Sequence, residues 1–194
     1  MKDKHAFLIA ITAVVVVVLY VTAAVLYSDT LVSLWAVVIF CVLMAGALFF
    51  PMRGLWPKVT RSSNRLLNLT VHFLVMAGAV AALFFVANYC GADMSTLHTE
   101  TAVASRKYTK TRHRTRRINR RVTGRGEPYT VYFVEFTMND GRVKTLEMSS
   151  KQYHRIRSGN EVEMQVARGM LGFPVIRRDK PITDTGHLPG VEVK

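Results

Sequence analysis

The stretch YTVYFVEFTMNDGRVKTLEM (129–148) decides the fold of the C-terminal half of this chain. Its first ten residues place Tyr132, Val134, Phe136 and Met138 at every second position, which is the period of a half-buried β-strand. The segment RVKTLEM has a similar alternation, and the NDG between the two is typical of a tight turn. The stretch therefore predicts an antiparallel hairpin.

The pairing register of this hairpin follows from its apolar residues. A two-residue turn would place Glu135 opposite Leu146. A three-residue loop, with Gly141 in the left-handed conformation, instead places Val134 opposite Leu146. Since the second register keeps apolar side chains opposite apolar side chains, we predict it.

Segments on both sides of the hairpin complete a small domain. Ser149 and Gln152 have capping-box spacing and predict a helix over 150–157. Further strands are predicted at 99–108, 161–167 and 173–177. The resulting order, with a long loop after the first strand and a helix between the third and fourth, matches the OB fold.

The predicted fold class is thus a membrane α+β protein with three transmembrane helices followed by a small five-stranded OB-like β-barrel. The barrel would cover residues 97–178, and residues 179–194 are predicted to form a flexible tail. An SH3-like barrel and an open meander are the alternatives for the same pattern of strands.

Three uncharged segments of the N-terminal half are long enough, at about 20 residues, to cross a bilayer. We predict transmembrane helices at about 6–27, 31–50 and 66–90, within a membrane region of residues 1–96. A cleaved signal peptide is the alternative for the first span. Its apolar stretch is longer than a typical signal core, which favours a retained helix.

Basic residues near the span ends predict the orientation. The loop between the second and third spans carries Arg53, Lys58, Arg61 and Arg65, whereas the turn after the first span carries none. We therefore expect a multi-pass protein of a cell inner or plasma membrane, with a cytoplasmic N-terminus and an extracytoplasmic C-terminal domain.

The third span contains both polar and small residues. Asn68 and His72 lie four residues apart, so they share one helix face, and we expect them to form hydrogen bonds between helices rather than a proton relay. The pairs Ala77/Ala81 and Gly78/Ala82 allow helices to approach closely. Packing of the three helices is the expected use, with homo- or hetero-oligomers through the helices as a further expectation.

The segment 105–126 holds ten Lys or Arg and no acid, and it accounts for the whole charge excess of residues 97–194. It is predicted as a basic loop, 106–125, joining the first two strands. As an extended arm it would present its alternating cations on one side, and their spacing suits a helix equally well. Thr109, Thr111 and Thr115 favour an extended or disordered arm, so we predict an exposed arm. The predicted anion-binding residues are Arg106, Lys107, Lys110, Arg112, Arg114, Arg116, Arg117, Arg120, Arg121 and Arg125.

Catalytic and metal-binding motifs are missing from the sequence. No phosphate-binding glycine loop, nucleophile elbow or zinc-protease motif occurs, and the histidines lack metal-ligand spacing. Cys41 and Cys90 lie in different apolar segments, so we expect no disulfide between them. We therefore expect no enzyme, no cofactor and no metal.

These patterns predict an integral membrane protein whose outward-facing barrel is a binding or assembly module. Its basic arm would contact an anionic envelope partner, which is a lipid headgroup, a glycan or an acidic protein. The alternatives are a membrane-anchored nucleic-acid-binding protein of OB type, an accessory subunit of a membrane complex, and a solvated loop that binds nothing. A nucleic-acid binder should carry stacking aromatics, and Phe133, Tyr129 and Tyr153 are available.

Overall fold

The computed structural model of the chain describes residues 2–119, 122–178 and 182–186. The chain divides into two compact units. The helical unit comprises Met1–Thr96 together with Arg168–Val175, and the sheet unit comprises Leu97–Ala167 together with Ile176–Lys194.

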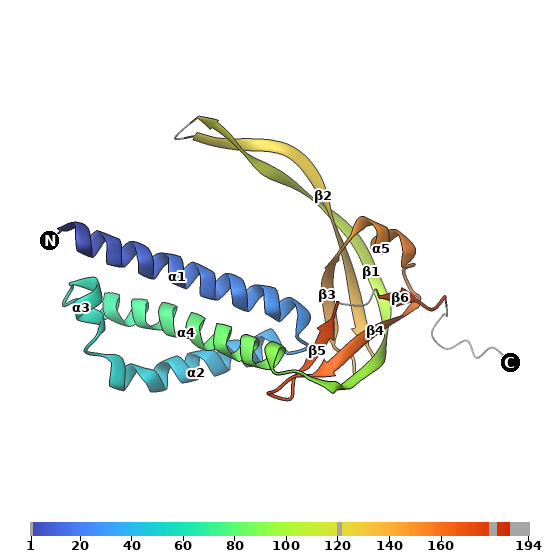
Figure 1. Cartoon of the computed structure of the whole chain (residues 1–194), viewed down its shortest axis with the longest axis horizontal. Helices are drawn as coiled ribbons and strands as arrows, with labels where there is room; N and C mark the ends of the chain where they lie inside the picture. Colours follow the sequence, from blue (N-terminus) through green and yellow to red (C-terminus); the bar gives the residue numbers. More distant parts are fainter. Residues whose placement is uncertain (1, 120–121, 179–181, 187–194) are drawn as a thin grey trace. The chain divides into compact units, whose positions relative to one another are not determined.

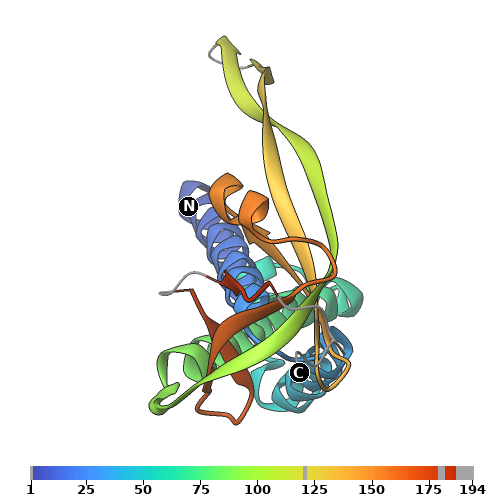
Figure 2. The same cartoon turned by 90° about the vertical axis from the view of Figure 1, so that its right-hand side faces the viewer.

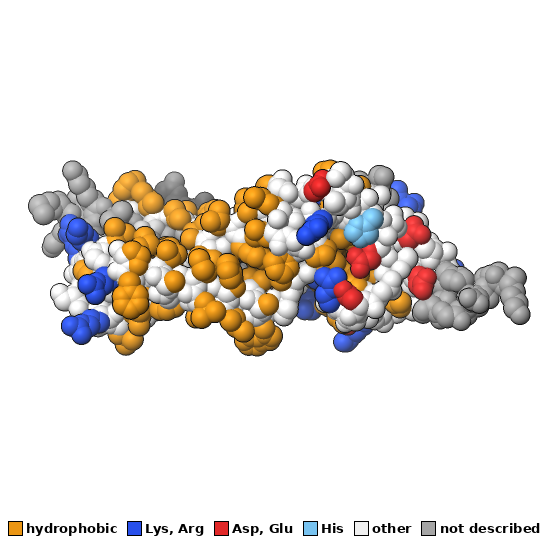
Figure 3. Space-filling view, turned by 90° about the horizontal axis from the view of Figure 1, so that it is seen from below, with side chains coloured by type: hydrophobic (Ala, Val, Ile, Leu, Met, Phe, Trp, Pro, Cys, Tyr) orange, Lys and Arg blue, Asp and Glu red, His pale blue; other side chains and the backbone are white. Residues whose placement is uncertain are grey.

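The helical unit contains α1 (Lys2–Asp29), α2 (Leu34–Met52), the short α3 (Trp56–Thr60) and α4 (Arg65–Cys90). The described parts of α1, α2 and α4 are long and apolar enough to cross a membrane. Helix α4 packs against both α1 and α2 and lies between them (Figure 1). Apolar side chains cover the outside of these helices (Figure 3), as expected where the surrounding solvent is lipid.

Local signals fix the ends of the short connection before α4. Helix α3 ends at Thr60, and the next residue, Arg61, has a φ of 51° in the left-handed region. Helix α4 begins after Asn64, whose side-chain oxygen accepts hydrogen bonds from the backbone N–H groups of Leu66 (3.0 Å) and Leu67 (3.2 Å). An N-cap of this kind stabilises a helix start by about 1 kcal/mol.

The strands are β1 (Asp93–Asn119), β2 (Val122–Met138), β3 (Val143–Met148), β4 (Glu161–Arg168), β5 (Pro174–Arg177) and β6 (Thr183–Asp184). Helix α5 (Ser150–Arg155) lies between β3 and β4 in the sequence. The first five strands form an antiparallel sheet in the order β3-β2-β1-β4-β5, and β6 pairs with β4. The structure therefore has three apolar helices followed by a five-stranded antiparallel sheet.

The predicted hairpin register is confirmed. Val134 lies opposite Leu146, and Gly141 adopts a φ of 81° in the turn. Val134 is fully buried, as are Val162 and Val166 of β4. Burying such a side chain contributes about 1.5–3 kcal/mol, so this alternation defines the core of the sheet.

The predicted helix after β3 is present and has the expected cap. Helix α5 begins after Ser149, whose hydroxyl accepts a hydrogen bond from the backbone N–H of Gln152 (3.3 Å) and donates one to the Gln152 side chain (3.0 Å). The helix ends at Arg155, two residues before the predicted end. Gly159, three residues after Ile156, has a φ of 90° and turns the chain toward β4.

The predicted barrel closure is not present. Closure would require β3 and β5, the two outer strands of the sheet, to pair with each other. In the described part of the chain the ladder ends at these two strands, so the sheet is open.

The basic segment 106–125, predicted as a loop, is instead the outer part of a long hairpin. Strand β1 continues to Asn119 rather than ending near residue 108, and it stays paired with β2 as far as Asn119 opposite Val122. In both views this two-stranded ribbon extends beyond β3 and β4 (Figures 1 and 2). Backbone hydrogen bonds along the ladder offset the repulsion between exposed cations, which lie about 6.6 Å apart at every second position.

The predicted flexible tail includes a described segment, residues 182–186, and the rest of it lies outside the described residues. Within this segment Asp184 accepts hydrogen bonds from the Arg157 N–H (2.9 Å) and the Asn160 side-chain amide (3.0 Å). Burial raises the pKa of the Asp184 carboxyl, but these hydrogen bonds outweigh burial and lower it. The segment is therefore held to the edge of β4.

The connection between β4 and β5 belongs to the helical unit. The side chain of Asn88, which is fully buried, donates a hydrogen bond to the Phe173 carbonyl (3.1 Å) and accepts one from the Leu171 N–H (3.1 Å). The Leu31 N–H donates to the Pro174 carbonyl (2.8 Å). These bonds fasten residues 168–175 to the ends of α1 and α4.

Candidate anion-binding face

The position of the basic side chains on the hairpin is set by a β-bulge at Ser105. Ala102 and Ala104 are buried and lie opposite Met138 and Phe136, but the next paired residue is Arg106, opposite Glu135. One extra residue in β1 makes the side chains that follow it exchange faces, because side chains alternate along a strand. Beyond the bulge, the even-numbered residues of β1 therefore face away from the core.

This shift gathers basic residues on one face of the hairpin, which we call the cationic face. A strand places every second side chain on the same side. The residues of β1 on this face are Arg106, Tyr108, Lys110, Arg112, Arg114 and Arg116. Their basic members are exposed. The row from residue 106 to residue 116 is about 33 Å long at 3.3 Å per residue.

Two aromatic rings lie within the cationic face. Tyr108 is paired with Phe133 of β2, and their rings stack with centroids 5.3 Å apart and an interplanar angle of 17°. Lys110 contacts both rings, at 5.5 Å and 5.6 Å from their centroids. Arg106 lies over Tyr108 and Arg112 over Phe133, at 5.6 Å and 5.8 Å. These cation–π contacts hold the basic side chains against the sheet.

Among the described residues one acid forms an ion pair with the row, and a second, Glu135, lies directly opposite Arg106 on the same face. Arg112 lies 3.6 Å from a carboxylate oxygen of Glu147 on β3, and the two side chains are 51% and 54% exposed. An ion pair as exposed as this one contributes little, about 0–1 kcal/mol. Arg112 is therefore available to an incoming anion at small cost.

The remaining predicted residues are placed differently. Lys107 lies on the opposite face of β1, where its ammonium group donates to the Ile156 carbonyl and lies 4.3 Å from the Tyr153 ring centroid. It therefore has a structural role beside α5. Arg125 lies on β2, opposite Thr115. The side chain of Arg117 is not described, and Arg120 and Arg121 lie outside the described residues.

A second bulge, nearer the tip of the hairpin, bends the ribbon. His113 lies opposite Pro128, but Thr115 lies opposite Arg125, so β2 has an extra residue there. A Cβ on Gly126 would lie 2.7 Å from the Arg114 carbonyl oxygen, so a glycine is needed for this close approach. Beside the bulge is an open hollow of about 550 Å³, to which Arg112, Arg114 and Arg125 contribute.

The polar residues of the third span form hydrogen bonds, as predicted. His72 is fully buried, and its Nδ1 accepts from the indole N–H of Trp56 (2.7 Å). The proton must then lie on Nε2, which donates to the Ala45 carbonyl (2.8 Å). Asn68 binds the Thr60 hydroxyl and the Ser62 carbonyl (2.9 Å). The two residues thus join α2, α3 and α4.

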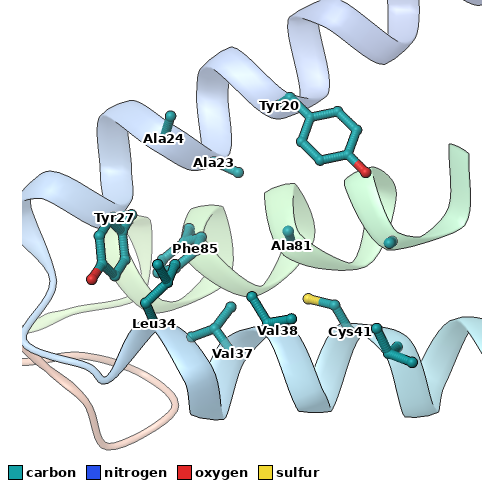
Figure 4. Close-up of a pocket in the computed structure, with 12 residues that line it drawn as sticks. Tyr20, Ala23, Ala24, Tyr27, Leu34, Val37, Val38, Cys41, Ala81 and Phe85 are labelled. Carbon is teal, nitrogen blue, oxygen red and sulfur yellow. The ribbon is translucent and has the colours of Figure 1, made fainter. Parts of the chain in front are cut away.

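The helical unit also has an open apolar pocket of about 340 Å³ (Figure 4). It lies between α1, α2 and α4, and its lining includes Ala23, Tyr27, Val37, Cys41, Ala81 and Phe85. The hydroxyl of Tyr20, at its margin, donates to the Leu74 carbonyl (3.0 Å). Gly78 of α4 packs against the Tyr20 ring, as expected of a small residue at a helix contact.

Sequence reasoning did not identify the ring pair or the role of Asn88. The pairing of Tyr108 with Phe133 depends on the bulge at Ser105, which nothing in AVASRKY indicates. Asn88 binds residues more than eighty positions away, and only its position at the polar end of an apolar span could have drawn attention to it.

Comparisons with protein-family models, with curated proteins and with solved structures found no match. Within the residues that the structure describes, no three His, Cys, Asp or Glu side chains lie close enough to share a metal ion. The cationic face is therefore the feature on which a function is best argued.

Proposed function

We propose that this chain is an integral membrane protein whose sheet unit is an extracytoplasmic binding module for an anionic envelope partner. The partner is a lipid headgroup, a glycan or an acidic protein. The observation that carries this proposal is the row of Arg106, Lys110, Arg112, Arg114 and Arg116 on one face of the hairpin. A row of exposed cations that forms one ion pair attracts polyanions and contributes little to the stability of the fold.

The proposed orientation rests on the basic residues around the helices. Lys and Arg side chains gather at the end of the helical unit that carries α3 (Figure 3), and the chain between α2 and α4 includes Lys58 and Arg61. The turn between α1 and α2 has no basic residue. Basic loops favour the cytoplasmic side, so the sheet unit would lie on the other side.

A reporter that is active only in the cytoplasm tests this orientation when it is fused after Lys194. We expect it to be silent there and active when it is inserted at Gly54, in the loop between α2 and α3. The opposite pattern would show that the sheet unit is cytoplasmic.

Removing charge from the cationic face tests the binding function. Substituting Arg106, Lys110 and Arg116 with Gln should weaken binding of the full chain to anionic vesicles by at least about tenfold, since each cation near such a surface contributes about 1 kcal/mol. The melting temperature should change little. Co-sedimentation at several salt concentrations measures the effect, because the contacts are screened within about 8 Å at physiological salt.

The matched control neutralises three exposed cations elsewhere on the sheet unit: Lys151, Arg155 and Arg157. We expect this variant to bind as the parent does. Equal losses in the two variants would mean that total charge, and not the cationic face, determines binding.

Nucleic-acid binding is the second candidate. The observation that favours it is the stacked Tyr108–Phe133 pair between basic side chains, because single-stranded nucleic acids bind cationic surfaces that also offer aromatic rings. Tighter binding to oligonucleotides than to anionic vesicles at the same salt concentration would favour this candidate.

A further inference from the structure

The hollow at the second bulge draws its lining from both strands of the hairpin and differs chemically from the cationic face. Its lining comprises Arg112, Arg114, Arg125, His113 and Tyr129, together with three threonines and a glycine. None of these residues is acidic, and Glu127, in the bulge itself, does not line the hollow. Arg114 and Arg125 form no ion pair with any residue that the structure describes. The hollow therefore offers hydrogen-bond donors in excess.

This set of donors favours a ligand in which several acceptor oxygens are bonded to the same atom. Each guanidinium carries five N–H donors in a fixed fork, and each threonine adds a hydroxyl. A carboxylate has two oxygens and is satisfied by one such fork. A phosphate monoester has three acceptor oxygens and up to two negative charges, so it makes use of two or three arginines together.

We propose that this hollow is a binding site for a phosphate group, carried by an anionic lipid or by a soluble phosphoester. The inference rests on the proposed function and deepens it, since it assigns one ligand chemistry to one part of the basic hairpin. The hollow is large enough, at about 550 Å³, for a phosphate together with the group that carries it. Tyr129, which is 42% exposed, offers a ring to that group.

The three helices favour the lipid as the source of the phosphate. A chain held in a bilayer meets lipid headgroups at a high effective concentration, so a modest affinity for one phosphate suffices for occupancy.

The test compares two variants of the full chain in phosphatidylcholine nanodiscs. The hollow variant replaces Arg112, Arg114 and Arg125 with Gln. The control replaces Arg106, Lys110 and Arg116, which carry the same charge on the same hairpin but do not line the hollow. Binding is measured to vesicles containing phosphatidic acid, a phosphate monoester, or phosphatidylglycerol, a diester, at matched surface potential. Inorganic phosphate and sulfate are the soluble competitors at matched ionic strength.

The parent chain should prefer phosphatidic acid to phosphatidylglycerol by about tenfold, because the monoester makes additional charged hydrogen bonds. The control should bind both vesicles more weakly but keep that preference. The hollow variant should lose the preference and its sensitivity to phosphate. Competition by inorganic phosphate at the affinity of the lipid would identify a soluble phosphoester as the source and would still support the site.

Other outcomes separate this inference from the proposed function. If both variants weaken alike and no preference for the monoester exists, the hollow is not a phosphate site, although the cationic face still binds anions. If neither variant changes binding to any anionic vesicle, both proposals are wrong. Tighter binding of a single-stranded oligonucleotide than of phosphatidic acid vesicles, lost in the hollow variant, would overturn the inference in favour of nucleic acid.

Discussion

Replacing Gly169 with alanine should destabilise the helical unit by about 2–4 kcal/mol. A Cβ at this position would lie 2.3 Å from Oδ1 and 2.4 Å from Nδ2 of Asn88. Asn88 cannot move aside without losing its hydrogen bonds to Phe173 and Leu171. Overpacking costs about 1–3 kcal/mol, and breaking these buried hydrogen bonds adds to that cost. Denaturant unfolding of the full chain in detergent micelles measures the loss.

Two further variants make this prediction specific. Gly54→Ala is the matched control, because a Cβ there meets no atom within 4 Å, and it should unfold as the parent does. In the Asn88→Ala background, Gly169→Ala should cost much less than it does alone, since the clashing amide is gone. Additive losses in the double variant would show that the two residues do not interact.

Replacing His72 with leucine should cost about 2–4 kcal/mol. The change leaves the buried Trp56 indole N–H without an acceptor, and it removes the bond that the Ala45 carbonyl accepts in addition to its helix hydrogen bond. The unsatisfied indole costs about 1–3 kcal/mol and the second lost bond about 1 kcal/mol more, and no water is available in a bilayer core to replace either bond. Unfolding by SDS titration of the purified chain measures the effect, and Trp56 fluorescence reports on the site directly.

The matched control for His72 is Thr70→Val on the same helix. The Thr70 hydroxyl bonds to the Leu66 carbonyl of its own helix and is exposed, so its loss should change stability by less than about 0.5 kcal/mol. A glutamine at position 72 should restore part of the stability, because its amide can both accept and donate. A His72→Leu variant as stable as the parent would mean that these hydrogen bonds do not hold α2 and α3 against α4.

The hairpin register was predictable because two independent signals agreed. Alternation of apolar residues fixes which side chains face the core, and Gly141 fixes where the turn lies. Their agreement placed Val134 opposite Leu146 without any tertiary information. The three apolar helices were predictable for a comparable reason, since length and absence of charge suffice to indicate a membrane span.

The conformation of the basic segment was not predictable, because the spacing of its Lys and Arg residues fits the period of a helix as well as that of a strand. With a Lys or Arg at almost every second or third position, a strand, a helix and a loop all fit. The outcome depended on β2, which pairs with this segment residue by residue. Barrel closure likewise depends on contacts between strands distant in sequence, and strand order along the chain does not determine whether β3 and β5 meet.

The outer ribbon of β1 and β2 has a consequence for self-association. Beyond the ends of β3 and β4, the described strands pair only with each other, so each has a free edge able to accept a strand from a second copy. Arg112 and Arg114 lie on the β1 edge and Arg125 lies on the β2 edge, so the free edges of two copies would repel each other. We therefore expect the charges that we propose for binding also to oppose self-association. Charge-neutralised variants should be compared with the parent only at protein concentrations at which sedimentation shows no aggregation.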